Sequence, residues 1–144
     1  MTASEHGRSF FDTNVLVYLF AADAPEKRAR ARQILERAAT AAELVVSVQV
    51  LQEFFVTVSR LPVEPLSPAA AEEEIRRFCA FEVVRADEAL VLAGIARTRA
   101  SKISFWDALI VEAALRANCA TLFTEDLQDG WQIDGRLRVV NPFA

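Results

Sequence analysis

The chain has 144 residues, of which 53% are hydrophobic and 25% are charged, and its formal net charge is −4. This composition excludes a disordered chain and suffices for one domain with its own core. The negative charge gives no general attraction to nucleic acid, so such a partner would need local basic patches. The single histidine, His6, argues against a Ser-His-Asp triad and against a His-rich zinc site. We therefore expect any chemistry to depend on carboxylates.

The sequence gives no sign of export or membrane insertion. No apolar run reaches about 18 residues, and the N-terminus is polar, so we expect neither a membrane span nor a signal peptide. Residues 1–7 are predicted to be a flexible tail. Cys79 and Cys119 lack a CxxC spacing and are interpreted as core residues of a cytoplasmic protein.

Short apolar strands alternate with helices along the whole chain. Strands are predicted at 8–11, 44–46, 81–84, 120–123 and 137–140. Helices are predicted at 15–20, 25–39, 48–61, 69–80, 88–100 and 104–116, with a polar turn at 131–135. This alternation predicts one α/β domain over residues 1–144. Its central sheet is expected to be mostly parallel, with four to five short strands and helices on both faces.

The helix at 104–116 carries a carboxylate on the side expected to be dry. At 100° per residue, Glu112 and Arg116 form an i,i+4 pair that marks the solvated face. Asp107 lies roughly 140° from Glu112 on this wheel, on the side of Val111 and Leu115. A buried carboxylate without a partner costs several kcal/mol or takes up a proton, so Asp107 needs a cation or hydrogen-bond donors.

Two of the predicted strands end in aspartate. Asp12 follows the first strand and Asp126 follows strand 120–123, and open parallel sheets place ligands at the carboxyl ends of their strands. Alternatively, Asp12 is the N-cap of the next helix and Asp126 is a turn residue. If both strand ends share an edge, the two carboxylates and Asp107 converge, and they all stay ionised only beside a cation. Oxygen ligands without His or Cys favour Mg²⁺ or Mn²⁺ over zinc.

Other charged residues have two interpretations each. Glu53 lies on the polar face of helix 48–61, where periodicity alone predicts a surface glutamate. Arg97, Arg99 and Lys102 end helix 88–100, where they either complement the helix dipole or bind phosphate. The basic residues of helix 25–39 form either a solvated face, which we favour, or a patch that faces RNA.

Four ordered segments carry a family resemblance: FDTNVLVY at 11–18, SVQVLQEFF at 47–55, SFWDALI at 104–110 and LFTEDL at 122–127. They resemble the PIN-domain ribonucleases, specifically the VapC toxins of prokaryotic toxin–antitoxin pairs, and residues 138–143 also fit that pattern. The resemblance spans nearly the whole chain in the same order. It implies a single PIN domain that acts as a metal-dependent endoribonuclease and is inhibited by a VapB-like antitoxin.

The resemblance also implies roles for individual residues. The acids that would bind Mg²⁺ or Mn²⁺ and carry catalysis are Asp12, Glu53, Asp107 and Asp126. Residues that would support them by hydrogen bonding are Thr124, Asn14 and Ser104, and Asp129 is a further candidate acid. A homodimer with grooves for RNA is expected. From charge alone, RNA phosphates would be guided by Arg85, Arg97, Arg99 or Lys102.

Two other functions are weighed against this one. A catalytically silent PIN-like protein-binding module predicts erosion of the acids, whereas all four are present. A phosphatase of the haloacid-dehalogenase kind would use Asp12 as its nucleophile. That pattern needs a second aspartate two residues later, where this chain has Asn14.

Overall fold

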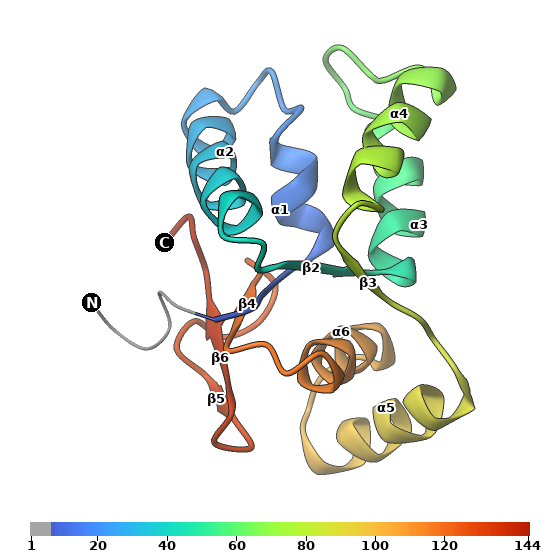
Figure 1. The fold of residues 1–144 in the computed structure, drawn as a ribbon, viewed down its shortest axis with the longest axis vertical. Helices are drawn as coiled ribbons and strands as arrows, with labels where there is room; N and C mark the ends of the chain where they lie inside the picture. Colours follow the sequence, from blue (N-terminus) through green and yellow to red (C-terminus); the bar gives the residue numbers. More distant parts are fainter. Residues whose placement is uncertain (1–6) are drawn as a thin grey trace.

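The computed structural model describes residues 7–144 and shows an α/β fold around one sheet (Figure 1). The strand order in the sheet is β3-β2-β1-β4-β6-β5, and every neighbouring pair is parallel except β5 with β6. The strands are β1 (Ser9–Phe11), β2 (Leu44–Ser47), β3 (Glu82–Val84), β4 (Thr121–Phe123), β5 (Gln132–Ile133) and β6 (Leu137–Val140). The prediction of a mostly parallel sheet is confirmed. The predicted tail and His6 lie outside the described residues, apart from Gly7.

The described sheet has six strands, so the predicted number of four to five is too low. The additional strand is β5, which lies within the predicted polar turn at 131–135. Ile133 is buried and pairs with Leu137 across a tight hairpin. Asp134 and Gly135 in its loop both have positive φ, which suits a tight hairpin connection. A strand of two residues is too short to show an alternating pattern.

Helices cover both faces of the sheet (Figure 1). The helices α1 to α4 lie on one side, and α5 and α6 lie on the other. Their bounds are α1 (Thr13–Tyr18), α2 (Pro25–Thr40), α3 (Val48–Val58), α4 (Pro68–Phe78), α5 (Glu88–Ala100) and α6 (Phe105–Arg116). Serine or aspartate caps five of these helices by accepting a backbone N–H bond, at Asp12, Ser47, Ser67, Asp87 and Ser104.

The core lies where the central strands meet the helices. Each residue of β1 and β2 is buried, as expected for parallel strands that are covered on both faces. Phe10, Phe11 and Leu122 are completely inaccessible. Their burial fixes the positions at which β1 and β4 end, and those ends carry polar residues.

The outer face of α6 differs from the prediction. Glu112 does not pair with Arg116, because α5 packs across this face of α6. Arg97 of α5 instead bonds Glu112, with Nε 2.9 Å from Oε2, and Arg116 pairs with Asp87 at 2.9 Å. Gly94 allows the close approach of the two helices, since a Cβ there would lie 2.8 Å from Leu109 Cδ2. The predicted i,i+4 pair is therefore wrong.

The two cysteines lie in different environments. Cys119 is buried, as predicted. Cys79 is exposed, so its assignment to the core is wrong; it is the C-cap residue at the end of α4. Within residues 7–144, no helix is both long and apolar enough to cross a membrane.

Candidate functional site

The candidate site lies where the order of the strands reverses. From β1 the chain adds β2 and β3 on one side, and later adds β4 and β6 on the other. β1 and β4 are parallel neighbours, with Phe11 opposite Phe123. Asp12 and Thr124, the residues that follow, are therefore side by side. Such a switch point at the carboxyl ends of strands is where open α/β sheets bind ligands.

Three carboxylates meet at this point. Asp12 comes from the end of β1, Asp126 from the loop after β4, and Asp107 from the first turn of α6. One oxygen atom from each lies within 4.8 Å of those of the other two. The structure thus brings together the three acids that were expected to converge from the strand ends and the helix. None of them forms an ion pair or hydrogen bond with a Lys or Arg of residues 7–144.

Asp12 is the most buried of these acids, at 5% exposed. Its Oδ1 accepts a hydrogen bond from Thr13 N at 2.7 Å, and its Oδ2 accepts one from Thr124 Oγ1 at 2.8 Å. Burial raises the pKa of the Asp12 carboxyl to about 7; the two hydrogen bonds oppose this effect, and the charges of Asp126 and Glu53 add to it. Asp12 is also the N-cap of α1. It therefore lies at the end of a strand and caps the following helix, so the two predicted positions coincide.

Asn14 and Thr124 connect the ends of the two strands. Asn14 Nδ2 donates to Asp126 Oδ2 at 2.9 Å and to Thr124 Oγ1 at 3.3 Å. The Thr124 hydroxyl also accepts from the backbone N–H of Asp126 at 3.1 Å. Asn14 Oδ1 accepts from the backbone N–H of Glu125 at 3.3 Å. These neutral groups orient the carboxylates without neutralising them.

Asp107 reaches the cluster from the start of α6. Ser104 caps this helix, with its Oγ accepting from Asp107 N at 3.0 Å. Partial burial raises the pKa of the Asp107 carboxyl, the Ser104 hydroxyl lowers it, and the charges of Asp126 and Glu53 raise it further. The proposed supporting residues Asn14, Thr124 and Ser104 therefore all contact an acid of the cluster.

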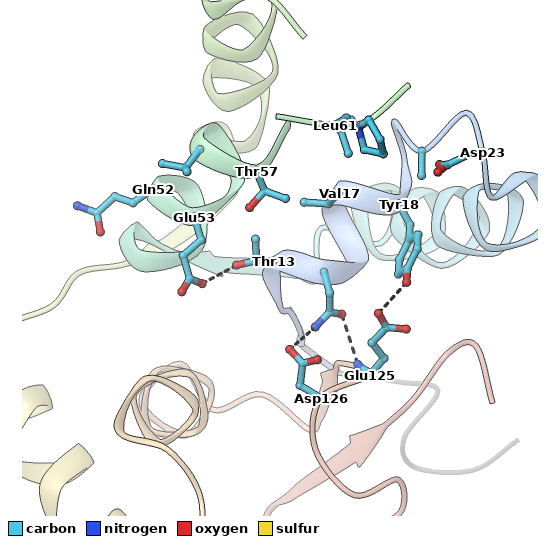
Figure 2. A pocket seen from close by; sticks show the side chains of 14 residues that line it. Thr13, Val17, Tyr18, Asp23, Gln52, Glu53, Thr57, Leu61, Glu125 and Asp126 are labelled. Carbon is cyan, nitrogen blue, oxygen red and sulfur yellow. Dashed lines mark hydrogen bonds between the residues drawn. The ribbon is translucent and has the colours of Figure 1, made fainter. Parts of the chain in front are cut away.

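Glu53 lies beside the cluster of three and is not part of it. It is partly buried on α3, and its Oε1 accepts a hydrogen bond from Thr13 Oγ1 at 2.8 Å (Figure 2). The polar face of α3 thus borders the site. The contact between Thr13 and Glu53 was not predicted, because the two residues are far apart in the sequence and belong to different elements. Thr13 nevertheless lies between Asp12 and Asn14 in the first motif.

A cleft of about 700 Å³ opens from the acids between α1 and α3 (Figure 2). Its lining combines apolar side chains with carboxylates and includes no Lys or Arg from the part of the chain that the structure describes. The apolar part consists of Val17, Ala21, Val56, Leu61 and Pro62, and the acids are Asp23, Glu53, Glu125 and Asp126. An anionic group entering this cleft would be repelled unless a cation were bound.

The remaining predicted residues lie elsewhere. Asp129 accepts a hydrogen bond from Asn141 N at 2.8 Å and stabilises the turn after β6. Arg97 is ion-paired with Asp134 and Glu112, and these contacts raise the pKa of its guanidinium against the opposing effect of burial. The other three proposed basic residues, Arg85, Arg99 and Lys102, are exposed.

The donor set fits a hard divalent cation. It consists of carboxylate oxygens from three separate elements, oriented by hydroxyl, amide and backbone donors. Mg²⁺ and Mn²⁺ prefer such oxygen ligands and commonly use only one or two protein carboxylates, with water at the other positions. Bringing together three like charges is costly without a cation. The geometry therefore suits Asp12, Asp107 and Asp126 as metal ligands.

Comparisons with known proteins agree with this fold. The PIN domain family matches residues 9–128, which is most of the chain, so the chain belongs to the PIN-domain family. A comparison with curated proteins gives no match.

Several solved structures of toxin–antitoxin proteins share the fold. A toxin–antitoxin complex from Klebsiella pneumoniae has a TM-score of 0.69 at 23% identity, covering 93% of this chain and 97% of that one. VapC20 from Mycobacterium tuberculosis, a toxin that cleaves the sarcin–ricin loop, has a TM-score of 0.62 at 20% identity, covering 82% and 91%. VapBC2 from Rickettsia felis, bound to a DNA fragment from its promoter, has a TM-score of 0.60 at 20% identity, covering 92% and 98%.

Proposed function

We propose that this PIN domain is a metal-dependent endoribonuclease and the VapC-type toxin of a toxin–antitoxin pair. The observation that carries the proposal is the cluster of Asp12, Asp107 and Asp126, with oxygens within 4.8 Å of one another and no Lys or Arg of residues 7–144 bonded to them. The fold shared with VapC20, a toxin that cleaves the sarcin–ricin loop, supports the substrate class. A catalytically silent domain has no need of three unpaired carboxylates at a strand switch point.

In this proposal the three aspartates hold Mg²⁺ or Mn²⁺. Such a cation lowers the pKa of a water molecule and offsets the negative charge that develops on the scissile phosphate. Asp12 and Asp107 are the principal ligands. Asn14, Thr124 and Ser104 fix the carboxylates through the hydrogen bonds described above.

Glu53 is proposed as the group that accepts the proton of the attacking water. Its Oε1 is held by Thr13, which leaves Oε2 to receive a proton. A general base must be oriented within hydrogen-bonding reach of its water. None of residues 7–144 is a histidine, so among the described residues a carboxylate is the natural candidate for this step.

RNA phosphates are proposed to contact Arg85, Arg99 and Lys102. Arg99 and Lys102 lie at the end of α5 and in the segment before α6, close in sequence to Asp107. Arg97 is a poor candidate, because Glu112 and Asp134 already use its guanidinium. Phosphate contacts of this kind position RNA without reading its sequence.

The proposed partners are a second copy of the chain, in a homodimer, and a VapB-like antitoxin in the cytoplasm. The cleft beside the acids supports an antitoxin segment with apolar side chains and one arginine. The arginine would compete with the metal for carboxylates through charge-assisted hydrogen bonds. The neighbours from Klebsiella pneumoniae and Rickettsia felis are complexes of toxins with antitoxins.

The test is cleavage of a mixed pool of structured RNAs by the purified protein without antitoxin. Reactions run with Mg²⁺, with Mn²⁺ and with EDTA, and include Asp107→Asn, checked for folding, and Glu36→Gln as a control on an exposed acid of α2. We expect cleavage that needs metal and falls at least about 100-fold in Asp107→Asn. Equal cleavage by Asp107→Asn and the wild type would contradict the proposal.

A further inference from the structure

The loop that carries Asp126 is anchored by a second group of side chains. Glu125, the preceding residue, points away from the acids toward α1 (Figure 2). Its Oε1 accepts a hydrogen bond from the hydroxyl of Tyr18 at 2.7 Å. Its Oε2 accepts from Lys27 Nζ at 3.2 Å. Both carboxylate oxygens are therefore bonded.

Phe143 completes this group. Its ring packs edge-on against Tyr18, with centroids 4.8 Å apart. Lys27 Nζ lies 4.7 Å from the centroid of Tyr18 and 5.5 Å from that of Phe143, within the range of cation–π attraction. Lys27 also donates to the Tyr18 hydroxyl at 3.0 Å. We refer to Tyr18, Lys27 and Phe143 as the Glu125 clamp.

The segment that carries Phe143 is itself fixed. Arg30 Nε donates to the carbonyl of Pro142 at 3.1 Å. Phe143 N donates to Asn141 Oδ1 at 2.9 Å, and Asn141 N donates to Asp129 Oδ1 at 2.8 Å. Asp129 belongs to the same loop as Asp126. This loop is therefore held at Glu125 by the clamp and at Asp129 by the backbone of Asn141.

We propose that Tyr18, Lys27 and Phe143 are positioning residues that fix Asp126 in the cluster of acids by holding Glu125. Asn14 binds the backbone of Glu125 and the carboxylate of Asp126 from one side, and the clamp binds the side chain of Glu125 from the other. Lys27 also forms an ion pair with Glu125, with Nζ 3.2 Å from Oε2. The inference rests on the proposed function, in which Asp126 binds metal.

The direction in which Lys27→Met changes the affinity for a cation separates a positioning role of Lys27 from a purely electrostatic one. Lys27→Met removes a positive charge near the acids, and Coulomb's law alone predicts tighter binding of a cation. Positioning predicts weaker binding, because Glu125 is released and Asp126 is less well held. Tyr18→Phe removes only the hydroxyl and changes no charge, so it tests positioning without this complication.

The experiment measures the Mn²⁺ dissociation constant of the metal-free protein by calorimetry. We expect it to rise about tenfold in Lys27→Met and severalfold in Tyr18→Phe and Phe143→Ala, as is usual for residues that orient metal ligands. Lys27→Arg retains the charge and donors and should stay near the wild-type value. Arg32→Met, which removes an exposed charge from the same helix, is the control. Unchanged or tighter binding in Lys27→Met and Tyr18→Phe would overturn the inference.

A second measurement follows the loop directly. Hydrogen–deuterium exchange of the metal-free protein should be faster at residues 124–128 in Lys27→Met and Tyr18→Phe than in the wild type and Arg32→Met. If the wild type binds no Mn²⁺, the proposed function fails, and exchange alone then decides the inference. Faster exchange in the clamp variants supports it, and equal exchange overturns it.

Discussion

Two groups of acidic side chains in this domain differ in what the chain places beside them. At the strand switch point, the donors that residues 7–144 offer to Asp12, Asp107 and Asp126 are all neutral. Between α5, α6 and the β5–β6 hairpin, Glu112 and Asp134 share Arg97, with N–O distances of 2.9 and 2.7 Å. The first group needs a cation from solution, whereas the second has one built in.

The titration of the two groups follows this difference. Burial raises the pKa of Asp12 to about 7, while the hydrogen bond from Arg97 lowers the pKa of Asp134. An acid that already has its cation stabilises the fold. An acid that is buried without a cation destabilises the metal-free fold when it ionises. Ligand binding explains a carboxylate at such a place better than fold stability does.

The largest expected effect of this difference between the two groups of acids is the change in stability of the metal-free protein with pH. Between the ordinary pKa of 3.8 and the folded value of about 7, folded Asp12 keeps a proton that the unfolded chain has lost. Stability should therefore fall as pH rises from about 4 to about 8, by up to about 4 kcal/mol. Urea unfolding in EDTA at several pH values measures this decrease, which Asp12→Asn should flatten. A stability that rises from pH 5 to pH 8 without metal would contradict the account.

The ion pairs of Arg97 with Glu112 and Asp134 are tested by removing the guanidinium. Arg97→Met leaves Glu112, which is largely buried, without a partner. We expect a loss of about 2 kcal/mol in the free energy of unfolding, with the Mn²⁺ affinity unchanged. Arg99→Met on the exposed side of the same helix is the control for stability and should stay within about 0.5 kcal/mol. A loss for Arg97→Met no larger than that of its control would show that the pair is not structural.

A smaller effect tests the neutral donors around the cluster. The Thr124 hydroxyl is buried and contacts Asp12, Asn14 and Asp126. Thr124→Val should weaken Mn²⁺ binding about tenfold, because Asp12 and Asp126 each lose a hydrogen bond that orients them. Thr98→Val is a matched control, since within residues 7–144 that hydroxyl bonds only the carbonyl of Ile95. Equal Mn²⁺ affinities in the two variants would show that the hydroxyl does not orient the site.

Much of the fold was predictable from local sequence signals. The caps Ser47 and Asp87 and the buried apolar strands mark the boundaries of their elements. The strand ends and the inward side of α6 predicted which aspartates converge. β5 escaped prediction because its two residues owe their pairing to a hairpin, and not to a hydrophobic pattern.

Contacts between elements could not be predicted. The pairing of Glu112 with Arg97 depends on how α5 lies across α6, which a helical wheel of α6 alone does not contain. The periodicity of α3 predicted a surface residue at Glu53, but the side chain is partly buried and its hydrogen bond to Thr13 places it at the border of the site. Its proposed role came from the family resemblance, and its geometry from the tertiary fold.

The most direct test of metal binding at the strand switch point is a calorimetric Mn²⁺ titration of the wild type, Asp107→Asn and Asp134→Asn. Both variants remove one carboxylate charge, one from each group of acids. We expect Mn²⁺ to bind to the wild type and to Asp134→Asn, with an affinity at least about 100-fold weaker in Asp107→Asn. A wild type that binds no Mn²⁺, or equal affinities for all three proteins, would contradict this expectation.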